Sequence, residues 1–189
     1  GGKQNGLLGC DIHTIGRRGS EVTGGDRETL TPGRHFVENC QIHNFGRIDR
    51  TYTPAIQLEG VGHRVAHNLM YDCPSSVMRI EGNDHLMEYN DVHSAVRESD
   101  DQGAMELFRN ATYRGVVFRY NRFRNVGKTG TGAAVHGQAA IRFDDAISGM
   151  LVYSNLFVRG ASGNFGAIQM NSGRDNLMDN NIFVDCKQG

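Results

Sequence analysis

The chain has 189 residues, with 20 Lys or Arg against 21 Asp or Glu, and a formal net charge of −1. No basic cluster of the kind that nucleic-acid binding requires stands out, and no apolar run approaches the ~20 residues of a membrane span. We therefore expect neither a nucleic acid nor a membrane as a partner. The 25 glycines, the 3 prolines and the absence of Trp favour a turn-rich β protein over a helical one.

The length fits a single domain over residues 1–189. The sequence does not start with Met, and its last residues still follow the repeated pattern described below. We expect a segment of a longer protein, in which further chain or a partner would cover the exposed strands at the two ends.

A five-residue phrase recurs along the chain, beginning with Gly9-Cys10-Asp11-Ile12-His13. Its second residue is Cys10, Cys40, Asn68, Asn90, Asn121, Asn155 or Asn181, so the repeats are 22 to 34 residues apart. Such a period with variable insertions is typical of a solenoid. The Asn side chains would hydrogen-bond along the stack. The apolar residues two places later would form an inner column, made of Ile12, Ile42, Met70, Val92, Phe123, Phe157 and Phe183.

A second phrase alternates apolar and polar residues at 19–24, 55–60, 77–82, 104–109, 140–145 and 167–172. This period of two predicts strands with one buried and one exposed face. Stacking them predicts one outward column of Glu21, Gln57, Arg79, Glu106, Arg142 and Gln169, and a second of Thr23, Glu59, Glu81, Phe108, Asp144 and Asn171. Small residues form a third column, Ala55, Ala104, Ala140 and Ala167, which we expect to leave room for a ligand.

The cysteines and histidines favour structural roles. No CxxC pair is present, so a structural zinc site is not expected. Cys10 and Cys40 should stack as neighbours, either as buried thiols or as a disulfide. His13, His43 and His93 share one position of the repeat, and we favour a stacked or exposed column over metal ligation because no carboxylate is spaced to complete a site.

The Asn ladder and its apolar rungs resemble the right-handed parallel β-helix proteins of the pectate-lyase-like superfamily, which includes polysaccharide lyases, glycoside hydrolases and epimerases. Within it, the phrases at 82–85, 98–103 and 142–145 are similar to those of bacterial β-helix glycoside hydrolases. The resemblance implies an all-β, right-handed parallel β-helix of about seven coils. It also implies a secreted protein, extracellular or periplasmic, that acts on a polysaccharide or oligosaccharide with two acidic residues as catalytic acid and base.

Acidic residues crowd the middle of the face that these strands would form, and neighbouring carboxylates can give one protonated acid beside one ionised base. We expect Asp101 and Asp144 to form the acid/base pair, with Glu106 and Asp145 in support. The residues expected to bind substrate are Arg79, Glu81, Arg142, Asp100 and His136. His136 lies near the end of a glycine-rich insertion, 127–138, which we expect to cover the groove as a lid. No cofactor or metal is expected for hydrolysis.

Three alternatives stay open. A polysaccharide lyase would use Arg79 or Arg142 as the base, with Ca²⁺ bound by oxygen ligands of Asp100, Asp101, Asp144 and Asp145. A non-catalytic glycan-binding or structural β-helix would bind sugar without cleaving it. The third alternative is that the charges only stabilise the stack, because opposite charges on neighbouring strands contribute about 0.2–1 kcal/mol per pair.

Overall fold

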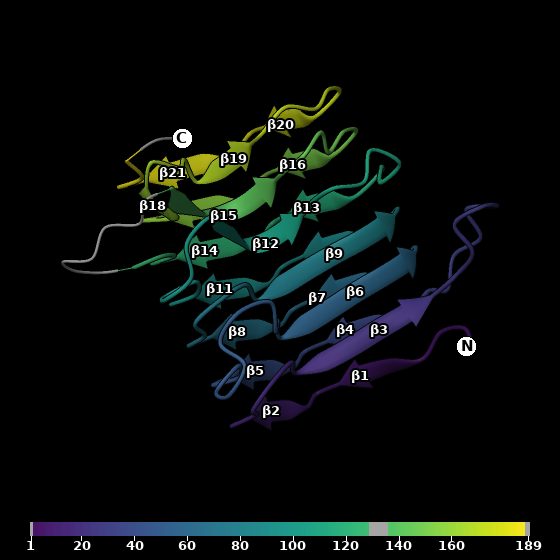
Figure 1. The fold of residues 1–189 in the computed structure, drawn as a ribbon. Helices are drawn as coiled ribbons and strands as arrows, with labels where there is room; N and C mark the ends of the chain where they lie inside the picture. Colours follow the sequence, from purple (N-terminus) through teal and green to yellow (C-terminus); the bar gives the residue numbers. More distant parts are fainter. Residues whose placement is uncertain (1, 129–135, 188–189) are drawn as a thin grey trace.

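The computed structural model describes residues 2–128 and 136–187, and these ranges contain β-strands but no helix. The strands form three sheets of seven, and within each sheet the strands follow one another along the molecule (Figure 1). Neighbouring strands pair in parallel, apart from β18, which pairs antiparallel with β15. The chain is therefore all-β, with the stacked parallel sheets of a solenoid, as the repeats predict.

Sheets A and B are built from three-residue strands. Sheet A contains β1 (Gly6–Leu8), β4 (Phe36–Glu38), β7 (Arg64–Ala66), β10 (Leu86–Glu88), β13 (Val117–Arg119), β16 (Leu151–Tyr153) and β20 (Leu177–Asp179). Sheet B contains β2 (Asp11–His13), β5 (Gln41–His43), β8 (Leu69–Tyr71), β11 (Asp91–His93), β14 (Arg122–Arg124), β17 (Leu156–Val158) and β21 (Ile182–Val184). In most of these strands the middle residue is the most buried of the three, as alternation requires.

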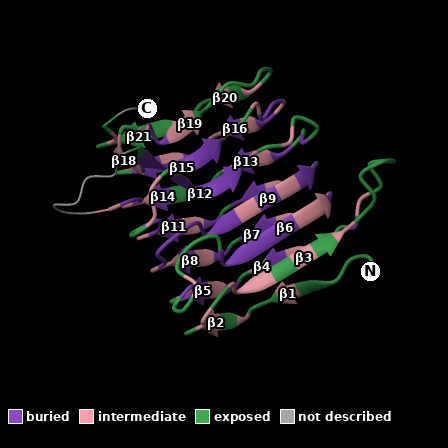
Figure 2. Ribbon diagram, in the orientation of Figure 1, coloured by how far each residue is buried: buried purple, intermediate pink, exposed green. Residues whose placement is uncertain are grey.

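Sheet C has the longest strands, and the predicted acidic site residues lie on these strands or next to their ends. It contains β3 (Ser20–Gly24), β6 (Ile56–Val61), β9 (Met78–Asn83), β12 (Gln102–Leu107), β15 (Gly137–Phe143), β18 (Ala161–Gly163) and β19 (Ile168–Met170). Its central strands are the most buried, and exposure rises toward the strands at both ends of the stack (Figure 2).

The predicted register is confirmed in both places where the sequence specifies it. In sheet B the inner residues pair in the expected order, from Ile12 opposite Ile42 to Phe157 opposite Phe183. In sheet C the first outward column is continuous from Glu21 to Gln169, and Glu106 lies between Arg79 and Arg142.

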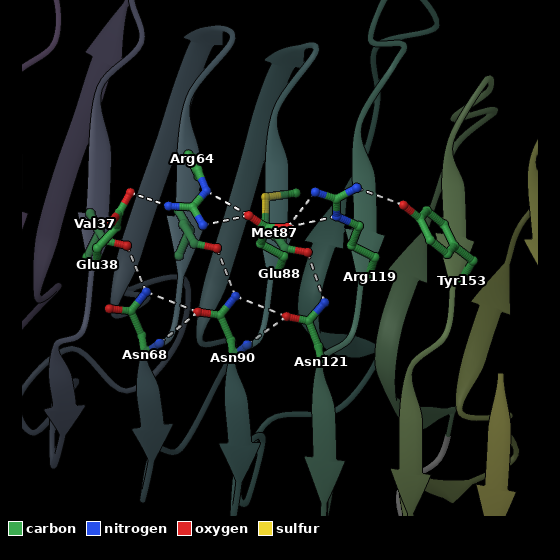
Figure 3. A network of polar contacts seen from close by, with 11 residues as sticks. Val37, Glu38, Arg64, Asn68, Met87, Glu88, Asn90, Arg119, Asn121 and Tyr153 are labelled. Atoms are coloured by element: carbon green, nitrogen blue, oxygen red, sulfur yellow. Dashed lines mark hydrogen bonds and ion pairs between the residues drawn. The ribbon is translucent and has the colours of Figure 1, made fainter. Parts of the chain in front are cut away.

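An amide ladder runs through the turns between sheets A and B. The residue before each rung has a left-handed backbone, as at His67 (φ 57°) and Tyr89 (φ 54°), which turns the chain sharply. The next residue then points its side chain along the stack. Asn90 Oδ1 accepts hydrogen bonds from the backbone N–H of Asn68 (3.1 Å) and from Asn68 Nδ2 (3.0 Å). In the same way, Asn121 Oδ1 accepts from the backbone N–H and Nδ2 of Asn90 (Figure 3). The buried polar groups of this turn are thereby satisfied.

A charged network lies on sheet A beside this ladder (Figure 3). Glu88, which is buried, accepts from Arg64 Nε and from Arg119 Nε, each at 2.7 Å. Arg64 also bonds to Glu38, and Arg119 donates to the hydroxyl of Tyr153 at 2.9 Å. Burial by itself would raise the pKa of Glu88, but the hydrogen bonds from the two guanidinium groups outweigh it, so the pKa is lowered.

Two expectations about small side chains have different outcomes. The four alanines of the third column do not leave room for a ligand, because Ala55, Ala104, Ala140 and Ala167 are fully buried in the apolar core. The four cysteines are free, so the disulfide alternative is wrong. Cys10 N–H lies 3.4 Å from Cys40 Sγ, so the two thiols continue the ladder where Asn is missing.

The histidine column is stacked, as favoured from the sequence. The rings of His13, His43, Tyr71 and His93 follow one another with centroids 4.7 to 5.2 Å apart. A membrane-crossing helix, long and apolar enough for that task, is not found among the residues that the structure describes.

Candidate active site

A pocket of about 360 Å³ opens on the outer face of sheet C, where β9, β12 and β15 lie next to one another. Six of the nine predicted site residues line it, together with Tyr52, Phe108 and Arg109; the six are Arg79, Asp101, Glu106, Arg142, Asp144 and Asp145. The stacking of equivalent positions therefore brings residues that are up to 66 positions apart in the sequence onto one wall. A larger hollow, of about 780 Å³, lies beside Arg27 and Arg114, outside this cluster.

Arg142 joins two of the acidic residues. Its Nη2 lies 2.7 Å from Asp101 Oδ1 and 2.9 Å from Asp144 Oδ2, so these two oxygens are at most 5.6 Å apart, the sum of the two distances. Nη1 donates to the backbone carbonyl of Asp101 at 2.7 Å, and Nε donates to Gln169 Oε1 at 3.2 Å. The guanidinium is thus held at several points and fixes both carboxylates against it.

Glu106 has a different environment. It is 3% exposed, at the floor of the pocket. Oε1 accepts a hydrogen bond from Ser76 Oγ at 2.7 Å, and Oε2 accepts one from the backbone N–H of Gly103 at 3.2 Å. Burial raises the pKa of Glu106, and the bond from Ser76, the charge of Arg79 and the bond from Gly103 offset only part of that rise.

Arg79 is held by aromatic rings more than by acids. Its guanidinium carbon lies 4.4 Å from the ring centroid of Tyr52 and 4.3 Å from that of Phe108. The Nε atom is 3.8 Å from Glu106 Oε1, which is an ion pair but longer than a hydrogen bond. Stacking on two ring faces keeps a cation in the pocket beside a carboxyl group that tends to retain its proton.

The rim of the pocket is more exposed. Asp145 follows Asp144 with a left-handed backbone (φ 51°); its side chain is half-exposed, and Oδ2 lies 3.9 Å from Arg109 Nε. Asp144 itself is partly buried and accepts a hydrogen bond from Asn171 Nδ2 at 2.9 Å. Asp144 is therefore oriented by two partners, whereas Asp145 is oriented by one loose ion pair.

The structure places the other three predicted residues elsewhere. Glu81 lines a neighbouring pocket of about 290 Å³, where it accepts from Gln57 Nε2 (3.2 Å) and from the hydroxyl of Tyr113 (3.0 Å). Asp100 accepts from the backbone N–H groups of His136 (3.1 Å) and Gly137 (2.9 Å). Asp100 and His136 thus meet at the entry to β15, outside the residues that line the main pocket. The expected lid falls largely on residues 129–135, which lie outside the described residues.

Sequence reasoning missed Ser76 and Gly103 as site residues. Ser76 precedes β9 and is fully buried, and its only signal in the sequence is its place one coil before the Glu106 strand. A Cβ at Gly103 would lie 2.6 Å from Arg142 Cβ and 3.0 Å from Arg142 N, so this glycine permits the close approach of Arg142. Tyr52 comes from the 46–54 loop, which alternation does not describe.

Most of the aspartates of the calcium alternative are bound by donors of the protein. Among the described residues, no three or more His, Cys, Asp or Glu side chains lie close enough to bind an ion together. Of the four aspartates in the calcium alternative, Asp101 and Asp144 bind Arg142, and Asp100 binds backbone N–H groups.

Comparison with protein-family models, curated proteins and solved structures gives no match to this chain.

Proposed function

We propose that this chain is a glycoside hydrolase that cleaves a polysaccharide or oligosaccharide in the sheet C pocket. The observation that carries the proposal is the pairing of unlike carboxyl groups there. Glu106 is buried with a raised pKa, while Asp144 and Asp101 are bound to a guanidinium. Glycoside hydrolysis needs one carboxyl group that donates a proton and one that acts as a base or nucleophile.

The geometry favours Glu106 over Asp101 as the proton donor. Asp101 is half-exposed, and its Oδ1 is bound by Arg142 Nη2 at 2.7 Å, whereas Glu106 is buried and its ion pair with Arg79 is 3.8 Å long. Glu106 lies one strand and two residues from Asp144, which places their Cα atoms roughly 8 Å apart by strand geometry. In this scheme Asp144 is the ionised partner, Asp101 and Arg142 hold it in place, and Arg79 with Tyr52 and Phe108 contacts the sugar.

We also propose a finer assignment of the fold. The amide ladder and the three in-register sheets support a right-handed parallel β-helix of about seven coils, related to the pectate-lyase-like superfamily. Membership of that group would make the protein extracellular or periplasmic.

A polysaccharide panel tests the proposal. Wild-type protein should release reducing ends without the ultraviolet absorbance of an unsaturated uronate, and chelator should have no effect. Glu106→Gln and Asp144→Asn should each lower the rate about 10²–10⁴-fold, because each removes one half of the acid/base chemistry. Asp11→Asn, an exposed carboxylate of sheet B, is the matched control and should keep wild-type activity.

Other results would indicate a different function. Chelator-sensitive ultraviolet absorbance would indicate elimination by a lyase. Glycan binding without any cleaved bond would indicate a binding module. Full activity in both Glu106→Gln and Asp144→Asn would reject the site.

A further inference from the structure

A hydroxyl group is buried directly behind the pocket. Ser76 is 0% exposed, and its Oγ lies 2.7 Å from Glu106 Oε1. The two residues are 30 positions apart and come from adjacent coils, just before β9 and within β12. A serine hydroxyl can rotate, so in this setting it donates to the carboxyl oxygen that faces it.

The contact leaves Glu106 free toward the pocket. A carboxyl group has about four lone-pair positions. One on Oε1 is used by Ser76, and one on Oε2 is used by Gly103 N–H at 3.2 Å. Both donors belong to the protein interior, so the remaining positions can accept or hold a proton on the pocket side.

We propose that Ser76 is a positioning residue for the reaction: its hydroxyl fixes the orientation of the Glu106 carboxyl group and favours the ionised form, which makes the proton easier to release. This inference rests on the proposed role of Glu106 as the proton donor. Ser76 touches no substrate in this arrangement, because Glu106 lies between it and the pocket.

The charged groups around Glu106 are few and come from both neighbouring strands. Arg79 of β9 lies 3.8 Å from Oε1, and Arg142 of β15 is its partner in register on the other side. Asp101 and Asp144 line the same pocket and are bound to Arg142. Ser76 is the uncharged donor with the shortest contact to the carboxyl group, so its removal should change the titration while the surrounding charges stay in place.

The test is the titration of the Glu106 carboxyl group in the whole protein, followed by ¹³C NMR with glutamate labelling and assigned by its loss in Glu106→Gln. Ser76→Ala should raise the midpoint by about one pH unit, because a hydrogen bond to a charged group is lost. Ser76→Cys should give a smaller shift, since a thiol is a weak donor of similar size, and it provides a second reading if the alanine variant folds poorly.

The matched control is Ser75→Ala. Ser75 is also buried, but it donates to Gln102 Oε1 at 2.5 Å instead of to Glu106. Its removal should leave the Glu106 midpoint unchanged. An unchanged midpoint in Ser76→Ala, or an equal shift in Ser75→Ala, would overturn the inference.

The pH profile of hydrolysis links this contact to the reaction. The alkaline limb of the profile should move to higher pH in Ser76→Ala, by the same number of pH units as the NMR midpoint. If the Glu106 midpoint shifts in Ser76→Ala but the wild type cleaves no glycan, the proposed hydrolase function is wrong and the Ser76–Glu106 contact is supported. The failure of the proposed function can therefore be told apart from the failure of this inference.

Discussion

At the scale of single residues, the histidines between sheets C and A show how a polar ring is accommodated in the stack. His35, His63 and His85 have ring centroids 5.0 and 5.1 Å apart. His85 Nδ1 accepts from the backbone N–H of His63 at 3.1 Å, and Nε2 donates to the carbonyl of Glu81 at 3.2 Å. Both ring nitrogens are used in the neutral form, and burial lowers the pKa of His85 to about 3.

This arrangement predicts a loss of stability in acid. An unfolded His takes up a proton near pH 6.5, whereas His85 in the folded chain does not until about pH 3. The stability from neutral His85 is therefore complete above pH 6.5 and falls between pH 6.5 and 3, by on the order of 5 kcal/mol in total. Urea unfolding at a series of pH values measures this loss.

The variant His85→Asn is the comparison, because it keeps an acceptor near the position of Nδ1 without a group that titrates in this range. Its stability should depend less steeply on pH than that of the wild type. Some dependence should remain, since burial also lowers the pKa of His63. Identical slopes in the two proteins would show that His85 is not the source.

At the scale of elements, the amide ladder joins one coil to the next. Asn90 makes four hydrogen bonds through its side chain: it accepts from Asn68 N and Nδ2, and it donates to the carbonyl of Val65 (2.9 Å) and to Asn121 Oδ1. Asn90→Ala would leave these buried partners unsatisfied, and we expect the free energy of unfolding to fall by about 3 kcal/mol. Thermal or urea unfolding measures this change.

Asn181→Ala provides the matched control for that prediction. Asn181 makes the same kind of bonds to Asn155 and to the carbonyl of Val152, but it is only half-buried in the last coil. Water can replace its bonds there, so its loss should be smaller. Equal losses in the two variants would mean that burial does not set the strength of the ladder.

At the scale of the whole molecule, stability should vary along the stack. The strands β9 and β12 lie between neighbours on both sides, whereas β1, β2 and β21 have a neighbour on one side and are largely exposed (Figure 2). In a stacked protein each repeat is stabilised by its neighbours. Hydrogen exchange should be slowest in β9 and β12 and fastest in β1, β2 and β21, and uniform rates would contradict this expectation.

The sequence predicts most of this stack and only part of the site. The period of two assigns Glu106 to the wall between Arg79 and Arg142, and pairing confirms it. Alternation, however, does not tell which loops cover a strand. Tyr52 therefore arrives unannounced from a loop to stack on Arg79. Alternation also misplaces Ala104, which belongs to the apolar core where open space was expected. The contacts of Asp100 with backbone N–H groups and of Ser76 with Glu106 depend on side-chain directions in neighbouring coils, which residue spacing alone leaves undetermined.

Neighbouring repeats are joined by the same kinds of strand pairing and amide hydrogen bonds along the stack. A repeat could therefore be added without changing how its neighbours are joined. Inserting a duplicated coil between β9 and β12 would lengthen the rod by about 4.8 Å and preserve the amide bonds within each junction. It would also separate Arg79 from Glu106, which are now opposite one another. The fold would therefore accept a duplicated repeat at most positions along the stack. An insertion between β9, β12 and β15 would instead disrupt the pocket, because these three strands form its wall.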